Sequence, residues 1–266
     1  QAIHLKKALL TRVSLQRCAK EIHMLLMGKN VGAVLRQFGD VLAVCIPELK
    51  PMLHFDQNTP YHNLSLWEHT VTAIEAIKPQ EDLRLAMLLH DIGKPAVQTT
   101  DAQWVSHYHG HPAVSAKMAR EILTRMHFSK KCIERVVTLI LYHDYRCAPT
   151  QRAVKRLLQK TGADIARQLA WIRRADIAAQ SDFRRAEKIG LIKAYETTLQ
   201  AVLQNGDCFS LRDLAVCGDD LLALGIPQGK QVGLLLNRLL DMVIDDSLPN
   251  KKDVLLQKAK QLFYSE

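Results

Sequence analysis

The stretch Leu88-Leu89-His90-Asp91-Ile92-Gly93-Lys94-Pro95 decides how this chain is interpreted, because it places a histidine and an aspartate at the end of an apolar run. Burying either polar group without a partner is costly. The pair therefore needs compensation, and a divalent metal ion is the obvious candidate. Further candidate ligands lie on predicted helices or at their ends: His69, His111, His143 and Asp176.

Asp176 continues the apolar stripe of a predicted helix over 164 to 182, because positions three or four apart share one helical face. The residues before it on that face are Ile165, Leu169 and Ile172. A carboxylate there needs a cation, which is either a metal ion or an arginine in a buried salt bridge. His69 also lies on the side that its helix buries, where a histidine is either a ligand or a packed core residue.

The order of these residues resembles that of the HD phosphohydrolase superfamily, whose members bind one or two divalent metals within a helical bundle. Two further blocks carry the match, Tyr108-His109-Gly110-His111-Pro112 and Leu141-Tyr142-His143-Asp144. The resemblance implies one metal held by His69, His90, Asp91 and Asp176. A second metal, where one binds, would be held by His111 and His143.

Spacing alone leaves open which of His107, His109 and His111 is a ligand, because alternate residues of an extended segment point the same way. His111 matches the Gly-His of the family pattern and stands at the entry of a predicted helix over 112 to 126. We therefore expect His111 to be the ligand, and the other two to be loop or substrate-facing residues.

The ligand types indicate the chemistry. Neutral imidazoles and carboxylates suit Mn, Fe, Co, Ni, Zn or Mg. Such an ion polarises a phosphoryl oxygen and lowers the pKa of a coordinated water, so we expect hydrolysis of a phosphate ester, either a small molecule or an RNA end. The catalytic candidates are Asp91, which would ligate the metal and orient the water, and Lys94. Lys94 either contacts a substrate phosphate or is a solvated residue after Gly93.

Composition sets the limits of the fold. The 266 residues are 48% hydrophobic, enough for one large domain or two small ones. No apolar run approaches a membrane span, so no membrane partner is expected, and the first residues lack the pattern of a signal peptide. Six scattered cysteines without a Cys-x-x-Cys pair indicate neither a disulfide framework nor a zinc ribbon, which favours a reduced, cytoplasmic setting.

Apolar stripes of helical period, separated by Gly, Pro or Asn, predict an all-α fold. The predicted helices span 15 to 27, 65 to 77, 82 to 92, 112 to 126, 130 to 143, 151 to 160, 164 to 182, 188 to 204, 211 to 224, 229 to 246 and 251 to 264. The exception is the loop at about 95–108, which allows a short hairpin and is long enough to be a lid beside the metal site.

The charge balance favours a polyanionic partner, because 36 Lys and Arg stand against 27 Asp and Glu, a formal net charge of +9. A single basic pair is most often a solvated helix face. The recurrence of such pairs supports contact with a nucleic-acid backbone, and the few aromatic residues favour a folded RNA over a stacked single strand. Candidates for substrate or RNA contacts are His109, Arg146, Lys155, Arg156, Arg173, Arg174, Gly229 and Lys230.

The last third resembles the tail of bacterial CCA-adding tRNA nucleotidyltransferases of the poly(A) polymerase family. The matching blocks are Phe209-Ser210-Leu211-Arg212-Asp213-Leu214, the stretch from Gly218 to Gly233, and Leu248-Pro249-Asn250-Lys251-Lys252. Earlier blocks from about Leu10 onward resemble the segment that joins neck to body in that family. The resemblance implies a helical connector over 1–57, an HD metal-binding domain over 58–185, an RNA-binding tail over 186–266, and tRNA as partner. The two family resemblances imply that the all-α fold is an HD-type helical bundle followed by a helical RNA-binding tail.

Two local patterns in the tail have physical interpretations. Ser210 with Asp213 is a plausible N-cap for the helix predicted over 211 to 224. The turn from Gly225 to Lys230 presents backbone N–H groups and a helix N-terminus that could receive a phosphate, or it is an ordinary turn between helices.

Nucleotide addition in that family needs an N-terminal head with a Gly-Ser turn and an Asp-x-Asp metal pair, and nothing here matches it. We therefore expect a portion of a tRNA nucleotidyltransferase that does not itself add CCA. Three functions stay open. The first is an HD phosphatase or 2′,3′-cyclic phosphodiesterase joined to a tRNA-binding module. The others are a non-catalytic tRNA-binding module with a structural or vestigial metal, and a free-standing HD nucleotide phosphohydrolase, against which the basic tail argues.

Overall fold

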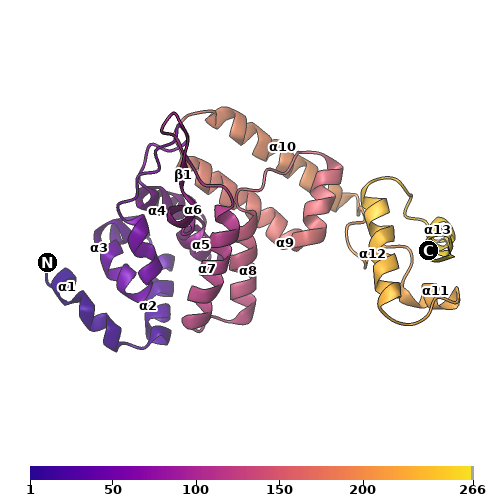
Figure 1. Ribbon diagram of the computed structural model, residues 1–266, viewed down its shortest axis with the longest axis horizontal. Helices are drawn as coiled ribbons and strands as arrows, with labels where there is room; N and C mark the ends of the chain where they lie inside the picture. The colour runs from indigo at the N-terminus through magenta and orange to yellow at the C-terminus, as the bar shows by residue number, and fades with distance from the viewer. Residues whose placement is uncertain (265–266) are drawn as a thin grey trace. The chain divides into compact units, whose positions relative to one another are not determined.

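The computed structural model describes residues 1–264 and shows an all-α protein, as predicted, with one two-stranded hairpin (Figure 1). In chain order the elements are α1 (Ala2–Lys6), the 3-10 helix η1 (Lys7–Arg12), α2 (Leu15–Met27), α3 (Val31–Cys45), the 3-10 helix η2 (Pro47–Met52), α4 (Leu66–Ala76), α5 (Glu81–Leu89), α6 (Lys94–Val97), β1 (Thr99–Thr100), β2 (Ser106–His107), α7 (His111–Arg125), α8 (Lys130–Tyr142), α9 (Gln151–Ala178), α10 (Arg185–Gln204), α11 (Gly218–Ala223), α12 (Lys230–Ile244) and α13 (Lys252–Tyr264). The hairpin falls inside the loop predicted to allow one.

The chain divides into two compact units. The first unit contains residues 1–146 and 167–192, and the second contains residues 147–166 and those from 193 onward. Helix α9 runs through residues of both units and is interrupted at Gly162, whose φ of 76° lies in the left-handed region that favours glycine. The sequence pattern predicts a helix break at this position.

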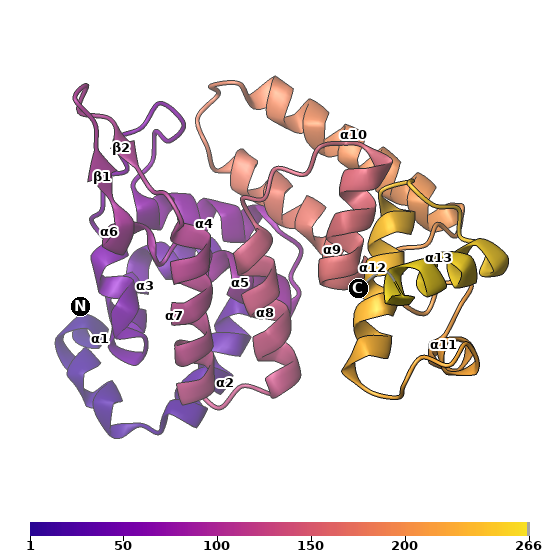
Figure 2. The same cartoon turned by 45° about the vertical axis from the view of Figure 1, so that its right-hand side comes forward.

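In the first unit, α5 is the central helix. It packs against α2, α4, α7 and α8, and α7 and α8 lie side by side (Figure 2). Every residue of α5 from Leu83 to Leu89 is buried. A helix that is covered all round belongs to the interior of its domain. The residues that follow it, His90 and Asp91, are therefore delivered into the middle of the unit, where both are 1% exposed.

The sequence prediction has no helix over residues 31–45, where the structure has α3 with its two glycines, Gly32 and Gly39. The structure shows that they allow α3 to approach α4 closely. A Cβ atom added to Gly39 would lie 2.9 Å from the indole ring of Trp67, and one added to Gly32 would meet the carboxylate of Glu75. The two glycines thus leave room on α3 for the α4 side chains Trp67 and Glu75. Helix α1 and the two 3-10 helices are also absent from the prediction.

The predicted helix over 211 to 224 is wrong in its first half. The Asp213 carboxylate accepts hydrogen bonds from the backbone N–H groups of Phe209 and Ser210 and from the Ser210 hydroxyl, and so closes a turn instead of starting a helix. Helix α11 begins only at Gly218, where Cys217 and Asp220 form a capping box. Two of the apolar residues that suggested a helical stripe, Leu214 and Val216, are packed into the core of the second unit from an irregular segment, whereas Leu211 is exposed.

The second unit is held together by α11, α12 and α13, which contact one another. Its apolar core contains Cys208, Leu214, Val216, Leu221, Ile226, Leu235, Leu239, Leu240, Val243, Ile244, Leu255 and Ala259. All six cysteines of the chain are free thiols. Within residues 1–264, no helix combines the length and the apolar character that a membrane span requires.

Candidate metal centre

The candidate ligands come together from elements that are far apart in the sequence. The structure places them in the first unit as follows: His69 on α4, His90 and Asp91 directly after α5, His111 at the start of α7, His143 directly after α8, and Asp176 on α9. Gly110, with a φ of 77°, turns the chain so that α7 begins with His111. Four of these six residues stand at helix ends, whereas His69 and Asp176 lie within α4 and α9.

Each of the four histidines is oriented by a backbone carbonyl. The Nδ1 atoms lie 3.1 Å from the Ala179 oxygen for His69, 2.7 Å from Met87 for His90, 2.8 Å from Tyr108 for His111 and 2.7 Å from Ile140 for His143. A carbonyl oxygen only accepts hydrogen bonds, so each Nδ1 carries the proton and each Nε2 presents a lone pair. This arrangement is typical of histidines that ligate metals through Nε2.

The Nε2 atoms face one another in two pairs. Those of His69 and His90 are 3.3 Å apart, and those of His111 and His143 are 3.2 Å apart. Asp91 lies between the pairs: its Oδ2 is 3.2 Å from His90 Nε2 and its Oδ1 is 3.2 Å from His111 Nε2. Both Asp91 oxygens are buried, and neither accepts a hydrogen bond of good geometry. Buried lone pairs that face each other need a cation between them.

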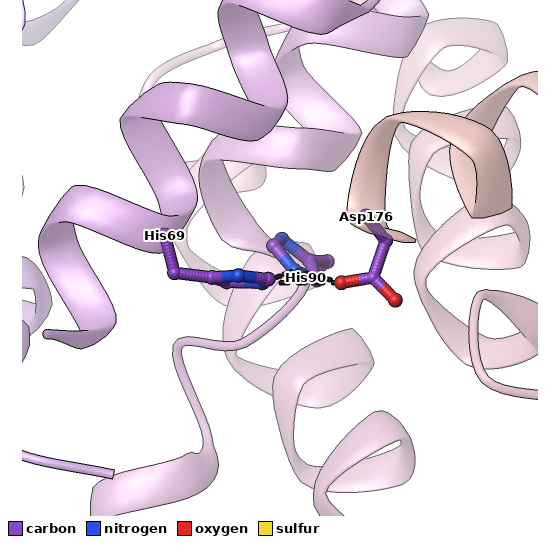
Figure 3. A group of neighbouring side chains, drawn as sticks. All are labelled: His69, His90 and Asp176. Atoms are coloured by element: carbon purple, nitrogen blue, oxygen red, sulfur yellow. Dashed lines mark hydrogen bonds and ion pairs between the residues drawn. The ribbon is translucent and has the colours of Figure 1, made fainter. Parts of the chain in front are cut away.

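Asp176 completes the first group of ligands. Figure 3 shows its carboxylate pointing at the rings of His69 and His90, with Oδ1 3.1 Å from His69 Nε2 and 3.8 Å from His90 Nε2. These three residues form one cluster with metal-ligand spacing, and His90, Asp91 and His143 form another. The two clusters share His90, and their imidazole and carboxylate donors suit borderline and hard divalent ions. The donor set fits the expected metal.

Opposite charges inside the site shift the titration of its groups. Burial raises the pKa of Asp176, but His69 outweighs it, so the pKa lies well below the ordinary value. Burial likewise opposes ionisation of Asp91, while His90 and Lys94 hold its pKa well below the usual range. In return, Asp176 and Asp91 overcome burial and raise the pKa of His69 to about 9. Protons therefore compete with a metal for the same lone pairs.

Lys94 is part of the buried site and is not a solvated residue. Its side chain is 5% exposed, and its Nζ lies 2.6 Å from Asp91 Oδ2. The same ammonium donates to Gln57 Oε1 at 2.8 Å and lies 3.5 Å from His62 Nε2. Of the two roles open for Lys94 in the sequence, the structure excludes the solvated one.

Gln57 and His62 are site residues that the sequence did not indicate. Gln57 is fully buried, and the His62 ring stands edge-on to His69 with 4.7 Å between ring centroids. Burial, with Lys94 and His69 nearby, lowers the pKa of His62 to about 3, so the ring is neutral. The two residues lie in a polar segment before α4 without any periodic pattern. Their proximity to the helix that carries His69 was the one available signal.

Four of the candidate ligands, Asp91, His111, His143 and Asp176, line a cleft of about 580 Å³. The hairpin and the segment after it line one side through His107, Tyr108 and His109. His109 is exposed, whereas the His107 ring bonds to Asp101 at 2.8 Å. The remaining lining includes the cationic side chains Arg146, Arg173, Arg184 and Lys188. Two of these, Arg146 and Arg173, are candidate substrate contacts from the sequence.

A family model described as "tRNA nucleotidyltransferase domain 2 putative" matches residues 96–259. The chain belongs to the tRNA nucleotidyltransferase family. It is 29% identical over 248 residues to the CC-adding tRNA nucleotidyltransferase of Thermus thermophilus, a match that covers 90% of this chain and 55% of that protein. It is 28% identical over 167 residues to the A-adding tRNA nucleotidyltransferase of Deinococcus radiodurans, covering 60% of this chain and 38% of that protein. The resemblance to tRNA nucleotidyltransferases is therefore confirmed. The chain spans about half the length, or less, of these curated relatives.

In this tRNA nucleotidyltransferase family member, two basic residues of the second unit are engaged internally. Lys155 is 5% exposed, and its Nζ lies 2.7 Å from Asp246 Oδ1. Arg156 pairs with Asp245 at 2.7 Å and also with Asp241. The sequence alone suggested RNA contacts for both, because the acidic partners come from α12 and the residues that follow it, far along the chain.

The remaining predicted contacts are more open. Lys230 is exposed at the first position of α12, directly after Gly229, which is exposed and has a φ of 147°. Arg173 is partly exposed on α9, and Arg174 beside it also has a partner in the structure. Arg146 is exposed after α8. The structure thus separates the exposed Arg146 and Lys230 from Lys155 and Arg156, whose charges are already paired with carboxylates.

Proposed function

We propose that the chain is a metal-dependent HD phosphohydrolase, a phosphatase or 2′,3′-cyclic phosphodiesterase, which also binds tRNA. One observation carries this proposal. The Nε2 atoms of four histidines converge with the carboxylates of Asp91 and Asp176, every histidine Nδ1 is held by a backbone carbonyl, and a cleft gives access to the group through Asp91, His111, His143 and Asp176. Such preorganised donors, whose Nε2 atoms can bind a metal ion in place of a proton, are what a metal centre requires.

His69, His90, Asp91 and Asp176 would hold one divalent ion, and His111, His143 and the other Asp91 oxygen would hold a second. When bound, the metal supplies a Lewis acid for the phosphoryl oxygen and an acidified water. Mn, Ni, Co, Mg, Fe and Zn all suit these donors.

The chain's own residues position the reaction. Asp91 faces both histidine pairs, and Lys94 holds its Oδ2 at 2.6 Å. The Lys94 ammonium donates a hydrogen bond to Gln57 and forms an ion pair with Asp91. When substrate binds, the N–H that faces His62 Nε2 at 3.5 Å would turn to a phosphate oxygen in the cleft, which Lys94 lines. This assigns Lys94 to substrate contact as well as to the support of Asp91.

We propose tRNA as the macromolecular partner. The names of the relatives, the net charge of +9 and the exposed Lys230 after the Gly229 turn support this assignment. In this division of labour, residues 58–185 hold the metal site, residues 186–266 contact the tRNA backbone, and residues 1–57 connect them to any preceding part of a longer protein. The reaction would take place in the cytoplasm, where tRNA is processed.

Hydrolysis of 2′,3′-cyclic AMP and bis-p-nitrophenyl phosphate by the purified chain tests the enzyme proposal. We expect turnover with at least one of Mn, Co, Ni or Mg, and loss of both turnover and bound metal in Asp176→Ala. Asp144→Asn is the matched control, because Asp144 lines the same cleft but is exposed. A folded wild-type sample that turns over neither substrate with any metal would overturn the enzyme proposal and leave a tRNA-binding protein.

A further inference from the structure

Three cations on the wall of the cleft have no acidic partner. Within residues 1–264, Arg146, Arg173 and Lys188 form no ion pair with a carboxylate. Arg173 makes a 3.4 Å hydrogen bond to the Tyr145 carbonyl, and Lys188 donates to the Gln180 side-chain oxygen at 2.7 Å. Two other cations of the lining, Lys94 and Arg184, do have carboxylate partners.

Arg184 also lines the cleft, but its guanidinium binds the carboxylate of Glu187 through two hydrogen bonds of 2.6 and 2.5 Å. In the second unit Arg156 is paired with acidic residues as well. Asp144 is the further acidic side chain of the lining, besides the metal-site carboxylates and Glu187, and it pairs with none of the three unpaired cations. Unpaired positive charge is therefore concentrated at one wall of the cleft.

The environment of Lys188 shows that the neighbouring positive charges make its protonated form less favourable. Burial lowers the pKa of its ammonium, and the positive charges of Arg146, Arg185 and Arg184 lower it further, while Asp176 acts in the opposite direction. Like charges that crowd a cleft repel one another and attract anions. A negatively charged ligand that lies against this wall would offset the repulsion among its cations.

The wall adjoins the metal ligands but is separate from them. Gln180 Nε2 donates to Asp176 Oδ2 at 2.8 Å, while Gln180 Oε1 accepts from Lys188 Nζ at 2.7 Å. One glutamine side chain therefore stands between the metal ligand Asp176 and the Lys188 ammonium. An anion bound by the wall would lie beside the reacting phosphate and would be a different group.

We propose that Arg146, Arg173 and Lys188 form a second phosphate subsite, which binds the phosphate on the 5′ side of the nucleotide whose 3′ phosphate lies at the metal centre. This inference rests on the proposed function, because it takes the metal centre as the place of the reacting phosphate. A cleft of about 580 Å³ is of the size that encloses whole small ligands. The substrate class is then an RNA 3′ end, in which a phosphate flanks the terminal ribose on either side.

Binding of two matched ligands tests the subsite without requiring turnover. Adenosine 3′,5′-bisphosphate and 3′-AMP differ only in the 5′ phosphate, and calorimetric titration of the manganese-loaded protein gives both dissociation constants. We expect the bisphosphate to bind roughly tenfold more tightly, the effect of one charge-assisted phosphate contact. Arg173→Ala and Lys188→Ala should each remove most of this ratio. The dinucleotide ApA with a 3′ phosphate should keep an advantage over 3′-AMP.

Arg184→Ala is the control, because Arg184 lines the same cleft with its charge bound to Glu187, and it should retain the wild-type ratio. Equal binding of bisphosphate and 3′-AMP by the wild type would overturn the subsite. A fall in the binding ratio in Arg184→Ala as large as that in Arg173→Ala would also overturn the subsite. The ratio would then reflect the total positive charge of the cleft and not contacts with the unpaired side chains. Failure of ApA with a 3′ phosphate to exceed 3′-AMP would overturn the assignment to RNA. Absence of hydrolysis contradicts the proposed function alone and leaves these ratios measurable.

Discussion

The Nε2 atoms of His111 and His143 lie 3.2 Å apart, although each ring gives its Nδ1 proton to a backbone carbonyl. Two imidazole lone pairs at this distance repel each other unless a cation lies between them or one ring takes up a second proton. Asp91 Oδ1 faces both rings, and its charge outweighs burial to raise the pKa of His143. The pair is therefore a place where either a proton or a metal ion must bind.

Removal of one histidine of this pair should remove one metal ion. We expect His143→Gln to lower the bound metal, measured by plasma mass spectrometry after gel filtration, from two ions per chain to one. Metal at about 100 times its dissociation constant should stabilise the wild type by about 2.7 kcal/mol per site, seen as a rise in the melting temperature. His109→Gln is the control, because His109 lines the cleft outside both clusters. Two ions retained in His143→Gln would exclude the second site.

Gly39→Ala should destabilise the first unit by about 1–3 kcal/mol, because the new methyl group meets the buried ring of Trp67, which cannot move aside. Gly32→Ala is the matched comparison. There the methyl group meets the end of the flexible Glu75 side chain, which can swing away at the expense of a surface ion pair with Arg36. Urea unfolding should rank Gly39→Ala as the more damaging change, and the reverse order would contradict the packing described for α3.

The part of the site that could be predicted from the sequence is the part that local pattern determines. His90, His143 and Asp176 stand at the ends or on the buried faces of strongly periodic helices, so their direction follows from helix geometry. Gln57 and His62 are placed by long-range packing of an irregular segment, which no local pattern reports. The ion pairs of Lys155 and Arg156 likewise depend on acidic residues about 90 positions away.

The fold shows the same division. Helices with one apolar face were predicted within a few residues of their ends. Helix α3 was missed because its glycines are explained only by the helix that packs against them. The segment from Leu211 to Val216 was assigned to a helix because its apolar residues have helical spacing, although the Asp213 side chain satisfies the backbone in a turn. In both cases a tertiary contact or a side-chain hydrogen bond overrides local propensity.

Acid should weaken the second unit through Asp220. Lys252 and the N-terminus of α11 lower the pKa of this carboxyl from 3.8 to about 2 in the folded chain. Because the folded value is the lower one, the stabilisation is present above about pH 4 and is lost as the pH falls through about 2. The difference in melting temperature between wild type and Asp220→Asn should thus shrink from pH 6 towards pH 2. Asp219→Asn, at the exposed neighbouring position, should show no such trend.

Basic residues of the second unit should differ in their effect on tRNA binding according to whether their charge is already paired. Lys230 is exposed at the start of α12, so Lys230→Ala should weaken binding several-fold and lower the slope of log K against log salt by about 1. Arg156 is bound to Asp241 and Asp245. Arg156→Ala should instead lower the free energy of unfolding by about 1 kcal/mol and leave the salt slope unchanged. Fluorescence anisotropy with labelled tRNA between about 50 and 200 mM salt separates the two effects. A larger loss of tRNA affinity in Arg156→Ala than in Lys230→Ala would show that the paired arginine is released to the RNA.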